Sequence, residues 1–142
     1  MIVPDANLLL YAYDSTATQH IRAAKWLERT LSGTELVGLP WQCIAAFLRI
    51  STNTTLPGQR YTPEEACKII ESWLGQPQVM PLSPDAHHWS HLQRSIIDGQ
   101  ARGPLVSDAQ LAALTIEHGG VLHTTDRDFS RFPGLRWINP LT

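Results

Sequence analysis

The sequence predicts an α/β fold built around a parallel sheet. Short apolar runs alternate along the chain with longer segments whose apolar residues recur every three to four positions, which is the spacing of a helix face. Strands that are separated by helices usually pair in parallel through right-handed crossovers. With 142 residues, of which 43% are hydrophobic, the chain suits one domain that spans residues 1–142 and has its own core.

The first half of the chain predicts two strands and four helical segments. Helix 20–31 is amphipathic, and Pro40 separates a strand from the helix that follows it. Thr62 is placed to cap a helix whose first residue is Pro63, and Glu65 completes a capping box. In order, we expect a strand at 2–3, a helical turn at 7–13, a helix at 20–31, a strand at 35–39, a helix at 41–51, a loop at 52–61 and a helix at 63–74.

The second half predicts three strands and two helices. Ser83-Pro84-Asp85 is typical of a helix start, and Ser107 is placed to cap a helix that Gly119-Gly120 end. In order, we expect a strand at 79–82, a helix from 83–85 to 99, a helix at 108–118, a strand at 121–124 and an edge strand within 134–138.

Composition narrows the class of protein. The chain has no run of 18 apolar residues, so no membrane span is predicted. The N-terminus lacks the basic and apolar regions of a secretory signal. We therefore expect a cytoplasmic protein. Cys43 and Cys67 lie in helical patterns and are expected to be reduced and buried. The net charge is −2, so any contact with nucleic acid must come from a local basic patch. The five Trp residues, Trp41 included, are expected in the core or at an interface.

Acidic residues follow the predicted strands at positions that a parallel sheet would bring together. Asp5 and Asp126 come directly after strands, Asp108 opens a helix, and Asp128 follows closely. Ligand sites of such sheets lie beyond the carboxyl ends of the strands. Carboxylates that meet there need a cation to offset their repulsion, and oxygen ligands favour Mg²⁺ or Mn²⁺. The pattern therefore points to metal-assisted phosphodiester hydrolysis.

Each of these acids also has an ordinary structural explanation. Asp5 could simply cap a helix, and Asp108 suits the dipole of a first helical turn. Asp126 could form an Asx turn, and Asp128 could cap the short turn at residues 129–131. Their shared position at one sheet edge favours the functional interpretation.

Polar neighbours could support such a site. Asn7, Ser107 and Thr124 (or Thr125) could bind a carboxylate or a metal-bound water. Four arginines could contact backbone phosphates, with an ordinary solvated surface as the alternative. They are Arg49, Arg102, Arg127 and Arg131. Trp41 and Tyr61 could stack on bases, although the core is the favoured place for Trp41.

Several segments also resemble a known family in their order and spacing. They are Asp5-Ala6-Asn7-Leu8-Leu9, Phe47-Leu48-Arg49 with Thr52-Asn53, Ser107-Asp108-Ala109-Gln110-Leu111-Ala112-Ala113-Leu114, Glu117-His118-Gly119, Thr124-Thr125-Asp126-Arg127-Asp128-Phe129 and Phe132-Pro133-Gly134-Leu135-Arg136-Trp137. The sequence resembles the PIN-domain nucleases, and most closely the VapC-like toxins of type II toxin–antitoxin pairs.

The resemblance implies a PIN-like three-layer α/β/α fold with a central parallel sheet of four to five strands. It implies an Mg²⁺-dependent endoribonuclease that cleaves RNA, in which Mn²⁺ can substitute. Asp5, Asp108 and Asp126 match the acids that bind the metal, and Asp128 matches an accessory acid. A cognate VapB-like antitoxin and a homodimer are also implied, with the helices at 41–51 and 63–74 as candidate interfaces.

One departure from the family pattern affects the metal site. Most such proteins carry a Glu directly before Phe47-Leu48-Arg49, where this chain has Ala46. We therefore expect one firmly bound ion rather than two, and a degenerate domain that binds RNA or antitoxin without cleavage is the alternative. Glu117 lies nine residues after Asp108, which turns it to the opposite helix face. Gln42 could bind a metal-held water, or could be an ordinary polar residue at a helix start.

Two other functions are less well supported. His87 and His91 have the spacing of zinc-binding helices but lack the accompanying acid, so a solvated helix face is expected. A phosphotransfer domain would need a second acid near Asp5, where Asn7 stands, and a late Lys, but no Lys follows Lys68.

Overall fold

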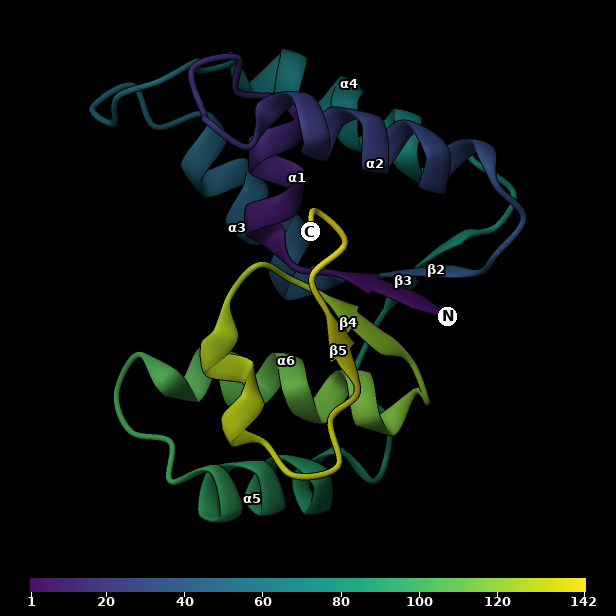
Figure 1. The fold of residues 1–142 in the computed structure, drawn as a ribbon, viewed down its shortest axis with the longest axis vertical. Helices are drawn as coiled ribbons and strands as arrows, with labels where there is room; N and C mark the ends of the chain where they lie inside the picture. Colours follow the sequence, from purple (N-terminus) through teal and green to yellow (C-terminus); the bar gives the residue numbers. More distant parts are fainter.

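Five parallel strands form one sheet in the order β3-β2-β1-β4-β5 (Figure 1). The structure is a computed structural model and describes residues 1–142. The strands are β1 (Ile2–Pro4), β2 (Val37–Pro40), β3 (Val79–Leu82), β4 (Val121–His123) and β5 (Trp137–Ile138). The helices are α1 (Ala6–Ala12), α2 (His20–Ser32), α3 (Trp41–Ser51), α4 (Pro63–Leu74), α5 (His88–Gly99), α6 (Leu105–Glu117) and the 3₁₀ helix η1 (Arg127–Arg131). The predicted α/β class and parallel sheet are confirmed.

The sheet separates two layers of helices. Helices α1 to α4 lie on one side and α5 and α6 on the other (Figure 1). Strand β1 serves both layers, because successive side chains of a strand point to opposite faces: Ile2 joins the cluster around Phe47 and Trp73, whereas Val3 joins the cluster around Leu111. The core therefore has two halves, and the predicted three-layer arrangement is confirmed.

The start of α4 follows the sequence prediction. The Thr62 hydroxyl accepts from the Glu65 N–H at 3.1 Å, and the Glu65 carboxylate accepts from the Thr62 N–H at 2.9 Å. These reciprocal bonds satisfy two donors that a helix start otherwise leaves without partners.

Two helix starts differ from the prediction. Helix α5 begins at His88 rather than at residues 83–85, because the Asp85 carboxylate accepts from the His87 N–H at 2.7 Å and holds a turn there. Helix α6 begins at Leu105, so Ser107 lies inside its first turn and does not cap it. Pro104 starts α6 instead, since its ring presets a helical φ. Strand β2 also lies slightly later than the expected 35–39.

Two predictions of burial are wrong. Trp41 is 49% exposed, because it shares a helix face with the exposed Ala45 instead of the inward face that carries Ile44 and Phe47. Cys67 is exposed, whereas Cys43 is buried, and both thiols are free. None of the helices combines the length and the apolar character that crossing a membrane requires.

Candidate active site at the carboxyl edge of the sheet

Asp5 is the most enclosed of the predicted acids. It directly follows β1, its side chain is 9% exposed, and its N–H donates to the His123 carbonyl at 3.0 Å. Although it occupies the N-cap position of α1, its carboxylate makes no capping hydrogen bond. Burial raises the pKa of Asp5, and Asp126 adds to the rise. The Thr124 hydroxyl and the nearby N–H groups of Ala6 and Asn7 at the start of α1 oppose this rise. The Asp5 carboxylate is therefore held mainly by its side-chain hydrogen bond from Thr124, and helix capping contributes little.

Thr124 joins two parts of the predicted site. Its hydroxyl donates to Asp5 Oδ2 at 2.8 Å and accepts from the Asp126 N–H at 3.0 Å. The residue is fully buried at the end of β4, next to β1 in the sheet. Because a buried hydroxyl has few alternative partners, this pair of bonds fixes the Asp5 carboxylate relative to the segment that carries Asp126.

Asp126 forms the Asx turn that the sequence allowed for it, and it also takes the capping role that the sequence suggested for Asp128. Asp126, not Asp128, is the cap of η1, since its carboxylate accepts from the Asp128 N–H at 2.9 Å. Asp128 is exposed in the first turn of this short helix. Asp126, three residues after the end of β4, has the extended backbone that a cap requires, so its carboxylate reaches the free N–H groups of the turn.

Asp108 brings the four acids into one electrostatic group. It lies in the first turn of α6 and is partly buried. The pKa of Asp108 is raised to about 6, mainly by burial and in addition by Asp126, Asp5 and Asp128. Arg131 opposes the rise. Since repulsion of this kind acts only over short distances in water-screened surroundings, the carboxylates that are distant in sequence lie near one another in the fold.

The supporting residues occupy different positions. Asn7 and Ser107 are exposed, and no side-chain hydrogen bond joins either to an acid. The Ser107 carbonyl accepts from Gln42 Nε2 at 3.2 Å, which links α3 to the start of α6. Glu117 points away from the acids, and its carboxylate lies 3.3 Å from His88 Nδ1. Of the two histidines predicted on a solvated face, His87 is exposed and His91 is partly buried. Sequence reasoning missed Cys43, whose buried thiol is close enough to Asp5 for that carboxylate to raise its pKa further.

Among the predicted arginines, Arg131 is the one whose charge affects the pKa of Asp108. Its Nη1 donates to the Gly99 carbonyl at 3.0 Å. All four arginines are exposed. Arg131 has one nitrogen held by the Gly99 carbonyl, and contacts with phosphate remain predictions for all four.

The donors at this edge fit a hard cation that keeps part of its water. No three His, Cys, Asp or Glu side chains lie close enough to enclose a single metal ion. Mg²⁺ does not need such an enclosure, because it usually binds one or two carboxylates together with water and substrate phosphates. Carboxylates with raised pKa values are the oxygen ligands that such an ion would stabilise.

The raised pKa of Asp108 predicts a pH-dependent stability of the metal-free protein. The pKa is about 6 in the folded chain, against an ordinary value of 3.8, so the native state holds more protons between these limits. The free energy of unfolding should therefore decrease as pH rises from about 4 to about 6. Because the group is partly exposed, solvent screening should limit the effect to about 1 kcal/mol. Denaturant unfolding in EDTA at several pH values measures it.

Asp108→Asn is the matched variant for this prediction. The free energy of unfolding of this variant should lack the decrease that Asp108 causes between about pH 4 and about pH 6. The variant should therefore be more stable than the unmodified chain above about pH 6. Identical pH profiles for the two proteins would show that Asp108 titrates normally.

Thr124→Val tests the hydroxyl that holds Asp5. Valine has nearly the same shape but cannot donate to the carboxylate, so any activity that needs Asp5 should fall by about 10-fold to 100-fold. Thr124→Ser retains the hydroxyl and should restore most of the activity. Initial rates of RNA cleavage compare the variants, and equal rates for valine and threonine would exclude a role for this bond.

Known proteins resemble this chain in sequence and in fold. The family described as PIN domain matches residues 2–135. Ribonuclease VapC37 of Mycobacterium tuberculosis is 36% identical over 140 residues, which cover 99% of this chain and 97% of that protein. Ribonuclease VapC33 of the same species is 36% identical over 142 residues, with 99% of each chain covered.

Solved structures support the same fold. The crystal structure of VapBC2 from Rickettsia felis, bound to a promoter DNA fragment, aligns with a TM-score of 0.70 at 16% identity and covers 98% of both chains. Mycobacterium tuberculosis VapC20, described as a Sarcin-Ricin loop cleaving toxin, aligns with a TM-score of 0.67 at 15% identity, covering 96% of this chain and 99% of that one. With the family match and the relatives taken together, the chain belongs to the PIN-domain family and, within it, to the VapC group.

Proposed function

We propose that the chain is an Mg²⁺-dependent endoribonuclease that acts as the toxin of a toxin–antitoxin pair in the cytoplasm. The single observation that carries this proposal is the group of carboxylates from β1, α6 and the segment after β4, in which Asp126 helps to raise the pKa of Asp5, and Asp126, Asp5 and Asp128 help to raise the pKa of Asp108. The relatives VapC37 and VapC33, which align over nearly the whole chain, are named ribonucleases. The group of carboxylates and the names of these relatives together favour hydrolysis of RNA phosphodiesters.

Each acid has a distinct place in the proposed mechanism. Asp5 and Asp108 are the proposed direct ligands, because Asp5 is fixed by Thr124 and Asp108 has the strongest need for a neutralising charge. Asp126 is proposed to act through water, since one carboxylate oxygen is already used by the cap of η1. Asp128 is exposed, so a role as metal ligand is the least supported for this acid among the four. Bound Mg²⁺ would lower the pKa of a water and offset the charge on the phosphoryl oxygens.

Arg131 is the proposed phosphate-positioning residue. Its guanidinium is held at one nitrogen by the Gly99 carbonyl and lies close enough to Asp108 to affect its pKa. A guanidinium has five N–H donors, so others remain for phosphate oxygens. The residue can therefore orient a phosphodiester beside the acids.

The proposed partner is a cognate antitoxin that inhibits cleavage. The solved complex from Rickettsia felis is named VapBC2 and contains promoter DNA. As part of the proposal, the present chain also binds an antitoxin of this kind and forms a homodimer. Trp41 is the one exposed large apolar side chain on α3, and α4 exposes none, so these helices offer less apolar interface than the sequence suggested.

The alternative is a degenerate domain that binds RNA or antitoxin without cleavage. Ala46 favours this alternative, since it supplies no carboxylate from α3. Two observations argue against a loss of the site: Asp126, Asp5 and Asp128 still help to raise the pKa of Asp108, and Thr124 still holds Asp5.

An RNA cleavage assay tests the proposal. With Mg²⁺, the purified chain should cleave single-stranded RNA; EDTA should abolish cleavage, and added Mg²⁺ or Mn²⁺ should restore it. Expression in a host with and without the product of a neighbouring small gene then tests inhibition. RNA that stays intact with Mg²⁺ while still binding the protein would support the degenerate alternative instead.

A further inference from the structure

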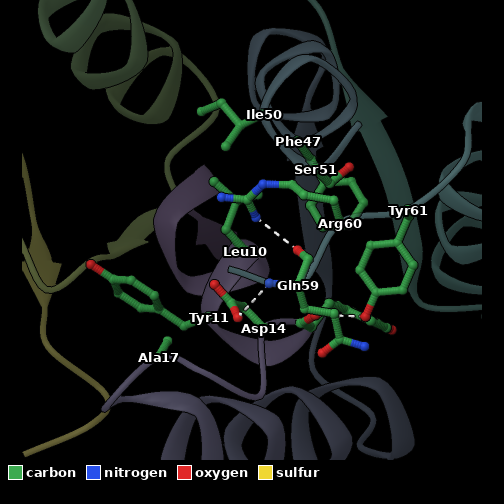
Figure 2. A pocket seen from close by; sticks show the side chains of 11 residues that line it. Leu10, Tyr11, Asp14, Ala17, Phe47, Ile50, Ser51, Gln59, Arg60 and Tyr61 are labelled. Atoms are coloured by element: carbon green, nitrogen blue, oxygen red, sulfur yellow. Dashed lines mark hydrogen bonds between the residues drawn. The ribbon is translucent and has the colours of Figure 1, made fainter. Parts of the chain in front are cut away.

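A preformed pocket lies apart from the four acids. It has a volume of about 170 Å³ and is enclosed by α1, the turn after it, the end of α3 and the loop before α4 (Figure 2). Its walls include the side chains of Leu10, Tyr11, Phe47, Ile50 and Tyr61. None of the acids at the carboxyl edge of the sheet lines it. The pocket is thus mainly apolar and aromatic, and the proposed chemistry does not use it.

Two polar atoms in this pocket lack partners. Ser51 is 2% exposed, and its hydroxyl oxygen makes no hydrogen bond. Arg60 Nε is also buried without an acceptor, although Nη1 donates to the Gln59 carbonyl at 2.7 Å and Nη2 to the Pro57 carbonyl. Burying a donor without a partner is unfavourable, so both atoms indicate a ligand that would supply the missing hydrogen bonds.

The loop that closes the pocket is held in place from several sides. The Tyr61 hydroxyl donates to the Tyr13 carbonyl at 2.6 Å. The Asp14 carboxylate accepts from the Gln59 N–H at 3.1 Å, and Asp14 lies beside Arg60 at the pocket (Figure 2). Since the polar groups are fixed before a ligand arrives, binding need not order the loop.

Helix α3 connects the pocket with the acids. Gln42, Ala46 and Ile50 are four residues apart and therefore share a helix face. Gln42 contacts the segment next to Asp108, whereas Ile50 lines the pocket. The exposed Arg49 lies three residues after Ala46 and seven after Gln42, so it shares their face of the helix. At a rise of about 1.5 Å per residue, the two ends of this face are about 12 Å apart, which a short stretch of single-stranded RNA can span.

We propose that this pocket receives one unstacked base of an RNA strand whose backbone reaches the acids. The inference rests on the proposed ribonuclease function and adds a base-binding subsite to it. Aromatic side chains provide surfaces for stacking, while Ser51 and Arg60 Nε face the polar edge of the base.

The chemistry of the pocket favours a base over other ligands. A free phosphate would face the Asp14 carboxylate and apolar walls, so most of its oxygens would lack donors. A base offers two flat apolar faces together with edge donors and acceptors, which match the walls, Ser51, Arg60 and Asp14.

Binding of mononucleotides to the full chain tests the subsite without any need for cleavage. We expect at least one of AMP, GMP, CMP and UMP, added in EDTA, to shift the NMR signals of the Ser51 amide and of the Arg60 Nε–H. Ribose 5-phosphate, which lacks the base, should leave these signals unchanged. Equal shifts with ribose 5-phosphate, or no shift with any of the four nucleotides, would overturn the proposal.

Ser51→Ala separates the subsite from the nuclease function. The Ser51 hydroxyl makes no hydrogen bond in the chain, so the variant should melt like the unmodified protein. We expect its KM for RNA cleavage to rise about fivefold with kcat unchanged, and its mononucleotide affinity to weaken by a similar factor. Ser90→Ala, at an exposed position on α5, should change neither quantity.

The two experiments have distinct ways to fail. Nucleotide binding at Ser51 in a chain that does not cleave RNA would support the subsite and contradict the nuclease. Cleavage with an unchanged KM in Ser51→Ala, together with absent nucleotide shifts, would contradict the subsite and leave the nuclease in place.

Discussion

Asp5→Asn should reduce RNA cleavage on the order of a thousandfold while leaving the fold intact. Asparagine keeps the shape of the side chain, and its amide oxygen can still accept from the Thr124 hydroxyl. It removes the charge of the most buried carboxylate of the site, so a divalent ion would lose a direct ligand. Loss of charge stabilisation at a reacting phosphate has effects of this size. Initial rates of RNA cleavage at saturating Mg²⁺ measure the loss of activity, and thermal melting checks that the fold is intact.

A matched control comes from an acid outside the site. Asp98→Asn removes the same charge from an exposed position on α5, so its cleavage rate should stay within about twofold of the unmodified chain. Because burial raises the pKa of Asp5, the metal-free Asp5→Asn protein should be at least as stable as the parent. Cleavage that persists in Asp5→Asn would remove Asp5 from the mechanism and with it the proposed metal site.

Trp73→Ala should lower the free energy of unfolding by about 4 kcal/mol. Trp73 is fully buried in the cluster between the sheet and α1 to α4. Its ring centroid lies 4.8 Å from that of Phe47 and 5.8 Å from that of Tyr13. Its indole N–H donates to the Tyr13 hydroxyl at 3.0 Å. Truncation would leave a cavity, break the edge-to-face contact and remove a donor, and urea unfolding would measure the sum.

Trp89→Ala provides the contrast within the same chain. Trp89 is 66% exposed on α5, so its truncation should change the free energy of unfolding by at most about 0.5 kcal/mol. Similar losses in the two variants would mean that burial in this cluster does not decide stability. The comparison also tests whether burial separates Trp73 from Trp89, because the sequence predicts the same core or interface position for both.

Local signals in the sequence account for much of the fold. The apolar run at 79–82 and the helix at 63–74 with its capping box are predicted within their observed limits, because their determinants lie within a few residues. The start of α6 was misplaced because two helix-start signals compete there. Ser107 is a good cap by residue type, but Pro104 begins the helix earlier and makes that cap unnecessary.

The burial of single side chains was harder to predict. Trp41 and Trp73 both lie in helical patterns, yet one is half exposed and the other fully buried. The difference depends on which helix face meets the sheet and on aromatic residues from elsewhere in the chain, which are Tyr13 after α1 and Phe47 on α3. Residue type alone carries no information about these partners.

The sequence by itself determined the strand–helix alternation, the class of sheet and the acids placed after strands, since all three follow from local pattern and from the geometry of parallel pairing. Only the tertiary structure decided how those acids interact. Thr124 binds Asp5 across 119 positions of chain, and the pKa of Asp108 reaches about 6 because burial and three distant carboxylates act on it together. Such electrostatic effects depend on distance and desolvation in space, which the order of residues along the chain does not specify.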